Sequence, residues 1–247
     1  KKIEKFSFKN KKDTNQAIEK IKKKKYKITD ISSKIYTRNP SGPFTTSTLQ
    51  QSSSSKLGFG ASRTMQIAQR LYQGIDIEGD TIGLITYMRT DGTNISNDAI
   101  NIFRNYIEKM YGKNYLPDNP NNFSGKKAKN AQEAHEAIRP TDINLKPDDV
   151  SKFLDSDSLK LYKLIWKRAL ASQMSSATFE RTALEISSED NSIKLRANGS
   201  IPKFDGFLNI YSEFKVKNDD IDKKNEDEES EDENSLPEVS LNTKINN

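Results

Sequence analysis

The sequence predicts an α+β protein in which a mainly helical segment interrupts a mainly β domain. From about residue 44 to residue 177, apolar residues recur every three or four positions, a pattern typical of amphipathic helices. Before and after this stretch, apolar residues are spaced among polar ones in the manner of strands. We therefore expect residues 1–43 and 178–247 to form one discontinuous domain, from which the helical domain 44–177 projects.

Composition restricts the class of protein. The chain has 247 residues, of which 33% are hydrophobic and 30% charged, so part of its length is expected to be solvated linker. The absence of cysteine excludes disulfides, thiolate metal sites and cysteine catalysis within this chain, and leaves the compartment open. A net charge of +5 suits a polyanionic partner such as nucleic acid, although solubilising surface lysines would give the same balance.

The first β part is expected to hold one helix and one strand. Residues 13–25 read as a helix that Asp13 caps, with an apolar face that includes Ile18. Residues 26–37 read as a strand, and the run Asn39–Pro43 is a breaker that sets the domain boundary.

Three helices are expected in the central domain, over residues 62–72, 96–110 and 157–174. Glycines two residues after the first two, Gly74 and Gly112, are typical helix ends. We interpret the apolar stripes of these helices as core.

Strands are expected again after residue 177. Residues 178–187 and 192–197 look extended, and Asn198-Gly199 predicts a hairpin turn into a strand over 200–211.

The C-terminal part also contains an acidic, low-complexity insert over about residues 217–235, which is expected to be disordered. One more strand is expected over residues 237–245. The charge is uneven along the chain, since Lys22–Lys25 form a basic run.

The segment Gly83–Asn94 carries the candidate chemistry. As a short strand, it would place Tyr87, Arg89 and Asp91 on one face. A tyrosine has an ordinary pKa of about 10, so attack at neutral pH needs a nearby cation or base. Arginine stays charged, and its fork fits phosphate oxygens. The pair suits attack on a phosphodiester, but chemistry alone favours the plainer interpretation of a strand-edge tyrosine beside a solvated arginine.

Five blocks of the sequence resemble, in order, the motifs of bacterial-type DNA topoisomerase I, a type IA DNA topoisomerase. The blocks are Pro43–Gln51, Lys56–Gly60, Ala68–Tyr72, Ile85–Asp91 and Ala131–Thr141. The resemblance extends from about Phe6 to Tyr211. It implies a helical tyrosine-bearing domain inserted in a discontinuous, mainly β arch domain. It also implies an ATP-independent enzyme that cuts one DNA strand through a 5′-phosphotyrosine, passes a strand, reseals, and relaxes negative supercoils.

The resemblance implies three catalytic residues. Tyr87 would attack the scissile phosphate, and Arg89 would contact that phosphate. His135, the only histidine of the chain, would help to position the DNA phosphate near the tyrosine.

The residues expected to bind DNA are Arg89, His135, Arg139, Thr90 and Gln50. Arg139 could instead form a salt bridge with Glu136 or Glu133.

Some polar and aromatic residues near the motifs have two interpretations. The run Thr45–Ser55 could contact the sugar-phosphate backbone, but helix capping and a solvated surface explain it equally well. Tyr72 and Phe59 could stack on single-stranded bases, although core packing is favoured.

Enzymes of this family also need Mg²⁺, which the resemblance assigns to an acidic domain absent from this chain. The segment Asp220-Ile221-Asp222 is a poor substitute for the acidic motif that binds the metal in that domain. We therefore expect a central fragment that binds single-stranded DNA weakly, does not relax supercoils alone, and is a monomer. A bacterial cytoplasm or a DNA-containing organelle would suit it. Alternatives are a decatenating type IA enzyme, a single-stranded DNA-binding module without catalysis, and an interaction scaffold built on the acidic insert.

Overall fold

The computed structural model describes residues 8, 10–123, 135–211, 240–241 and 243–245. They fall into two compact units, a sheet unit and a helical unit. The sheet unit contains the described residues up to Tyr36, Phe179–Lys203 and residues 240–245. The helical unit contains Thr37–Thr178 and Phe204–Tyr211. Helices and strands are both abundant, which confirms the predicted α+β class. The acidic insert predicted over 217–235 lies outside the described residues.

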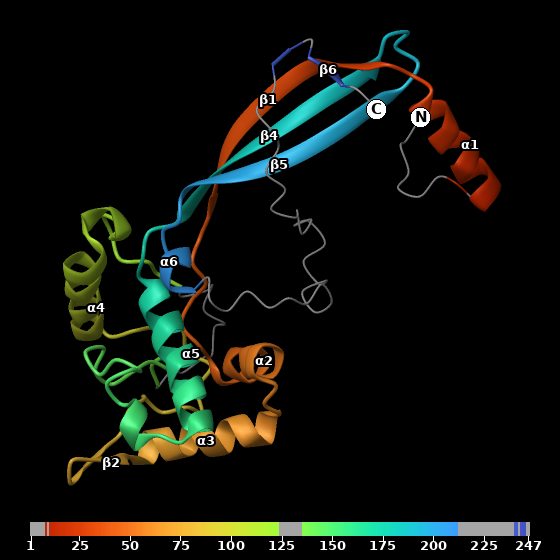
Figure 1. Ribbon diagram of the computed structural model, residues 1–247. Coiled ribbons are helices and arrows are strands. Elements are labelled where there is room, and N and C mark those ends of the chain that lie inside the picture. Colours follow the sequence, from red (N-terminus) through yellow and green to blue (C-terminus); the bar gives the residue numbers. More distant parts are fainter. Residues whose placement is uncertain (1–7, 9, 124–134, 212–239, 242, 246–247) are drawn as a thin grey trace, which may run out of the picture. The chain divides into compact units, whose positions relative to one another are not determined.

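A four-stranded sheet with the order β5-β4-β1-β6 forms most of the sheet unit. Its strands are β1 (Tyr26–Arg38), β4 (Ala177–Ser188), β5 (Lys194–Phe204) and β6 (Lys244–Ile245). The three long strands run side by side as a curved ribbon (Figure 1). Strand β6 pairs antiparallel with β1, with Tyr26 opposite Ile245. The strands predicted over 26–37 and 178–187 are therefore confirmed.

The hairpin turn predicted at Asn198-Gly199 is wrong, because β5 runs straight through these residues. The chain turns earlier, where Asn191 adopts a left-handed φ of 56°. The Asp190 carboxylate accepts hydrogen bonds from the Ser188 hydroxyl (2.6 Å) and the Ser192 hydroxyl (2.9 Å), and it pairs with Lys24. Hydrogen bonds from Lys24, Ser188 and Ser192 lower the pKa of Asp190. An aspartate that ties its own turn together defines the turn better than an isolated Asn-Gly pair.

The end of the predicted strand over 200–211 is also wrong. Leu208–Tyr211 form a short helix, α6, directly after β5.

The N-terminal helix, α1 (Lys11–Lys22), is capped by Asn10 and not by Asp13. The Asn10 side chain accepts a hydrogen bond from the Asp13 backbone nitrogen at 2.9 Å. The expected apolar face is not core within the described residues, since no residue of α1 is buried.

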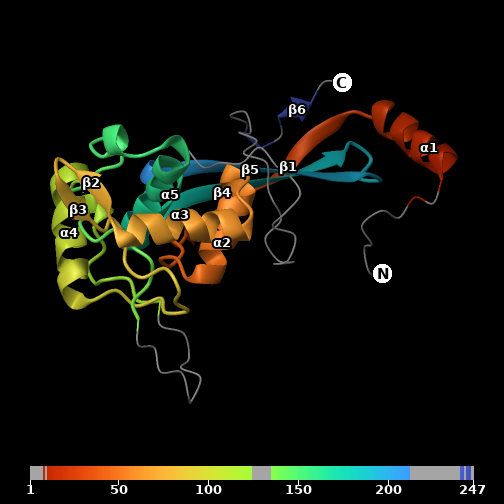
Figure 2. The same ribbon diagram turned by 90° about the horizontal axis from the view of Figure 1, so that it is seen from below.

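The helical unit is organised around one buried helix, α5. Its long helices are α2 (Thr46–Leu57), α3 (Ala61–Gln73), α4 (Asn97–Tyr111) and α5 (Ser156–Ser172). Short 3-10 helices, η1 (Lys113–Tyr115) and η2 (Ser151–Phe153), lie between them. Helix α5 contacts α2, α3 and α6, and Figures 1 and 2 show α3 crossing it. The helices predicted over 62–72, 96–110 and 157–174 are confirmed.

A small hairpin that the sequence analysis missed connects α3 to the candidate tyrosine. Strands β2 (Ile75–Ile77) and β3 (Asp80–Ile82) pair around Glu78 and Gly79, which both have positive φ. The hairpin extends from the end of α3 (Figures 1 and 2). Its closing residues lead directly into the Tyr87 segment.

Candidate active site

The segment around Tyr87 is not a strand, so that prediction is wrong. Only an isolated bridge, between Ile85 and Pro140, occurs in it. Its backbone is instead anchored to three other parts of the chain. Leu84 N donates to Leu71 O (2.8 Å), Thr86 N donates to Arg139 O (2.9 Å), and Thr90 O accepts from Thr46 N (2.8 Å). A regular strand shares its backbone hydrogen bonds with the strands beside it. This segment shares them with three separate parts of the chain, and it therefore bends instead of running straight.

Burial in this segment separates a core side from an accessible side. Leu84, Ile85 and Met88 are fully buried and fasten the segment to the core. Tyr87 is half-buried and Arg89 is exposed. Tyr87 and Arg89 are therefore accessible, while the buried side chains next to them fix their backbone to the core.

Two aromatic side chains flank the Tyr87 ring. The His135 ring lies with its centroid 5.0 Å away, tilted by 53°. The Tyr72 ring, at the C-terminal end of α3, meets Tyr87 edge-on at 5.4 Å. Tyr72 is 41% exposed, so the expectation that it belongs to the core is wrong, whereas Phe59 is buried as expected. We refer to Tyr72, Tyr87, Arg89 and His135 as the tyrosine site.

The backbone around Tyr87 and the backbone around His135 are hydrogen-bonded to each other where the two side chains meet. A side chain at Gly92 would collide with the His135 carbonyl oxygen, so this close approach requires glycine. Ala137 N donates to Asn94 O at 2.9 Å. The Thr86 hydroxyl donates to Ala137 O at 2.7 Å. These contacts bring His135 to Tyr87 across 48 positions of sequence.

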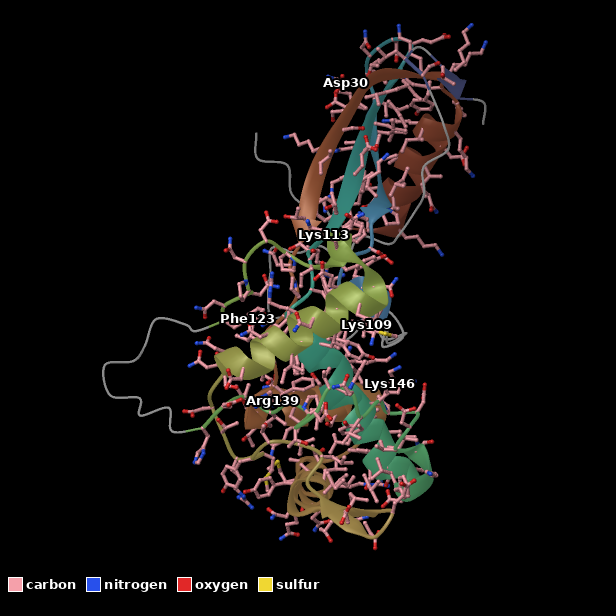
Figure 3. All side chains as sticks on the ribbon, turned by 90° about the vertical axis from the view of Figure 1, so that its left-hand side faces the viewer. Asp30, Lys109, Lys113, Phe123, Arg139 and Lys146 are labelled. Carbon is pink, nitrogen blue, oxygen red and sulfur yellow. The ribbon has the colours of Figure 1, made fainter. Side chains whose placement is uncertain are left out.

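Arg139 (labelled in Figure 3) is paired within the protein. Its Nε donates to Glu136 at 2.7 Å, its Nη1 donates to Pro140 O at 3.0 Å, and its side chain is only 12% exposed. Burial alone would raise the pKa of Glu136, but the hydrogen bond and charge of Arg139, with hydrogen bonds from Ser96, lower that pKa overall. The salt-bridge alternative for Arg139 is therefore present. Glu133, the other partner considered, lies outside the described residues.

The hydroxyl of Thr90 stabilises the bend that follows Arg89. Thr90 is buried, and its hydroxyl accepts a hydrogen bond from Gly92 N at 3.0 Å. Its backbone nitrogen donates to the Thr46 hydroxyl at 2.8 Å. Thr46, which the sequence analysis did not single out, also donates to Met88 O at 2.8 Å.

The polar run at the start of α2 is explained in part by capping. Thr45 and Thr48 form a capping box at the N-terminus of this helix. Gln50 lies one turn further along α2 and is half-exposed.

The tyrosine site does not fit a magnesium ion. Among the described residues, no three histidine, aspartate or glutamate side chains gather as metal ligands would. We therefore derive no step through a metal on this chain. Nor does the described part of the chain include a helix with the length and apolar character needed to span a bilayer.

Comparison with known proteins identifies the family. A family model described as DNA topoisomerase matches residues 1–246. The chain belongs to the type IA DNA topoisomerases. This membership confirms the family that the five sequence blocks indicated. Type IA topoisomerases are generally magnesium-dependent.

Similar topoisomerases come from several bacteria. DNA topoisomerase 1 of Rickettsia felis is 50% identical over 212 residues, which is 86% of this chain and 27% of that protein. DNA topoisomerase 1 of Rickettsia typhi is 48% identical over 90% of this chain and 28% of that protein. The structure of full-length topoisomerase I from Thermotoga maritima covers 99% of this chain at 30% identity and a TM-score of 0.77, and the match spans 36% of that protein. The chain thus spans about a quarter of the length of the curated relatives it matches.

Proposed function

We propose that Tyr87 is the nucleophile with which the complete protein cuts one strand of DNA. The observation that carries this proposal is the placement of the half-buried Tyr87 ring beside His135, 5.0 Å between ring centroids, with exposed Arg89 two residues further on. The backbone beneath these groups is fixed by hydrogen bonds. A fixed nucleophile beside phosphate-binding groups reduces the entropic cost of reaching the transition state.

The reaction is a transesterification in both directions. The Tyr87 oxygen attacks the scissile phosphorus and loses its proton, and the bond from phosphorus to the 3′ oxygen breaks. The 3′ oxygen leaves with a proton, while the 5′ phosphate stays on Tyr87. Resealing reverses these steps, so ATP is not required.

In this proposal, Arg89 and His135 contact DNA directly. The Arg89 guanidinium would bind phosphate oxygens and stabilise the charge that develops on them. His135 would help to place the phosphate against the Tyr87 oxygen, and Gln50 would contact the strand from α2. Because Arg139 and Thr90 are already bonded within the protein, we assign them the role of positioning this segment.

The complete enzyme would hold Mg²⁺ on a domain outside this chain and relax negative supercoils by passing one strand through the break. The chain alone should bind single-stranded DNA weakly as a monomer and should not relax supercoils. A DNA-binding module without catalysis is the second candidate. The accessible positions of Tyr87 and Arg89 favour the enzyme over it.

The test uses the full-length protein with Mg²⁺ and an oligonucleotide labelled at either end. After denaturation, the 3′-labelled strand should migrate with the protein, and the 5′-labelled strand should give a shortened free product. Tyr87→Phe should abolish both signals, whereas Tyr72→Phe, a matched loss of a neighbouring hydroxyl, should keep them. An adduct that persists in Tyr87→Phe, or that carries the 5′ label, would overturn the proposal.

A further inference from the structure

A cleft separate from the tyrosine site lies in the helical unit. It has a volume of about 310 Å³ and is bounded by α4, the turn at residues 146–148, α5 and α6. None of its lining residues belongs to the tyrosine site. Figure 3 labels Lys146 beside the α5 ribbon. The volume is at the lower end of the range for small-ligand pockets.

The wall of this cleft is aromatic and rigid. Tyr106 and Trp166 pack edge to face, with centroids 5.8 Å apart and planes at 84°, and both are buried. The Trp166 indole nitrogen donates to Ile143 O at 3.0 Å, which fixes the ring. Tyr111, which is half-buried, adds a third ring. Tyr106 and Trp166 are only 8% and 5% exposed, so the half-buried Tyr111 is the most accessible of the three rings for a planar ligand, and the other two hold the wall behind it in place.

The rim of the cleft is basic. Three lysines, Lys146, Lys163 and Lys167, line it with one aspartate, Asp148, and a second carboxylate, Asp149, acts on Tyr106, so three positive charges less two negative charges leave an excess of one. Lys167 is only 8% exposed. A charge in such a low-dielectric setting attracts an anion more strongly than a charge in bulk water. Lys163 and Lys167 also have interactions with the protein itself.

The two phenols add hydrogen-bond donors. Burial raises the pKa of Tyr106, with smaller contributions from Tyr111 and Asp149, and burial also raises the pKa of Tyr111. Both hydroxyls therefore stay protonated at neutral pH and are able to donate to an anion.

We infer that this cleft binds one nucleotide of a single DNA strand, with the base against the aromatic wall and the phosphate between the lysines. A basic groove combined with aromatic rings is the usual chemistry of single-strand binding. The choice of DNA rests on the proposed function. A strand held both here and at Tyr87 would be bound at two places, so longer strands should bind more tightly than short ones.

The chain contains its own probe for this cleft. Trp166 is the only tryptophan, so intrinsic tryptophan emission reports on this place alone. The 247-residue chain would be titrated with unlabelled oligothymidylate while Trp166 emission is recorded, and separately with the same fluorescein-labelled oligonucleotide while anisotropy is recorded. We expect both signals to saturate over the same concentration range.

Charge reversals locate the binding. Lys146→Glu and Lys163→Glu should each raise the oligothymidylate concentration at half-maximal Trp166 response roughly tenfold. Each variant removes a phosphate contact and adds a repulsion. Lys160→Glu is the matched control, since this exposed lysine of α5 is not part of the lining. It makes the same change in net charge and should weaken binding far less. Circular dichroism would verify that each variant is folded.

Two results would overturn the inference. The first is unchanged Trp166 emission when anisotropy shows that DNA is fully bound. The second is an equal response to inorganic phosphate, which would reduce the cleft to a general anion site. Covalent adduct formation is measured separately. If an adduct forms but Trp166 emission does not respond, only the inference about the cleft is rejected. If Trp166 emission responds but no adduct forms, only the proposal about the nucleophile is rejected.

Discussion

The accessible side of the tyrosine segment and the buried backbone beneath it use polar residues in opposite ways. Tyr87 and Arg89 present their polar groups toward solvent. Thr46, Thr86 and Thr90 use their hydroxyls to bond the backbone, with donor–acceptor distances of 2.7 to 3.0 Å for their principal contacts. Thr86 and Thr90 therefore place part of the framework in the same stretch of sequence as Tyr87 and Arg89, and Thr46 adds to it from the start of α2.

This difference shows how an irregular segment can be held firmly. Regular strands share a ladder of backbone bonds, but the tyrosine segment has only one isolated bridge. Side-chain hydroxyls replace the missing ladder, and each such bond contributes about 1 kcal/mol to stability. Substitutions on the accessible side should therefore change activity without changing stability, and substitutions in the framework should change stability first.

The largest effect expected after loss of Tyr87 itself is that of Arg89→Ala. In the proposed reaction Arg89 binds the scissile phosphate, so removal of this exposed guanidinium should slow adduct formation roughly a hundredfold. The free energy of unfolding should change by less than about 0.5 kcal/mol, as for other exposed positions. Rapid-quench kinetics and urea unfolding measure the two quantities. Arg89→Lys should recover only part of the rate, because an ammonium lacks the planar fork.

Thr86→Val should destabilise the protein by about 1–3 kcal/mol, because it leaves partners of a part-buried hydroxyl unpaired. This hydroxyl donates to Ala137 O and accepts from Arg139 N. Thr141→Val is the matched control, since the Thr141 hydroxyl also bonds a backbone oxygen, that of Gly83, but is exposed. Water can replace the lost bond there, so the loss in urea unfolding should be smaller. Equal losses in both variants would contradict the framework account.

Glu136 should make stability depend on pH in the acid range. Its pKa is lowered in the folded protein, so its contribution is present above the unfolded value of about 4.3 and is lost as pH falls through the lower folded value. The wild type should therefore exceed Glu136→Gln in stability at pH 6, and the gap should close below about pH 4. Urea unfolding across this range measures the gap. A gap that widens on acidification would contradict the assignment.

The smallest expected effect is that of Tyr72→Phe. Tyr72 contacts Tyr87 through its ring, so loss of the hydroxyl alone should leave the rate of adduct formation within about twofold. Tyr72→Ala removes the ring contact and should slow adduct formation more, because a small misplacement of reacting groups is costly. The same quench assay separates the two variants. Equal rates for both variants would show that the ring contact has no part in placing Tyr87.

The sequence predicted most of the elements and less of their connections. Periodicity located α3, α4 and α5, because their apolar stripes become core. It failed at residues 83–91, because the anchors of that segment are Thr46 and Arg139, which no local pattern reveals. The turn predicted from the Asn198-Gly199 pair was also wrong, because hydrogen bonds to Asp190 stabilise a turn earlier in the chain.

The motifs indicated the residues of the candidate site, and the structure adds how these residues are arranged. The five blocks indicated Tyr87 and His135 together, but their spacing alone did not predict that the rings would meet. The exposure of Tyr72 was missed because its helical position suggested core. The basic cleft is built from four separate elements, so only the folded chain brings its three lysines together.

The most direct test of the central claim is to identify the residue that carries the DNA. Trypsin should release Leu71–Arg89, a peptide that contains both Tyr72 and Tyr87. After the full-length protein has reacted with an oligonucleotide and nuclease has trimmed the DNA, fragmentation mass spectrometry would locate the residual nucleotide on this peptide. The account predicts a phosphodiester on Tyr87 and an unmodified Tyr72. A nucleotide on Tyr72, or on any residue outside this peptide, would contradict it.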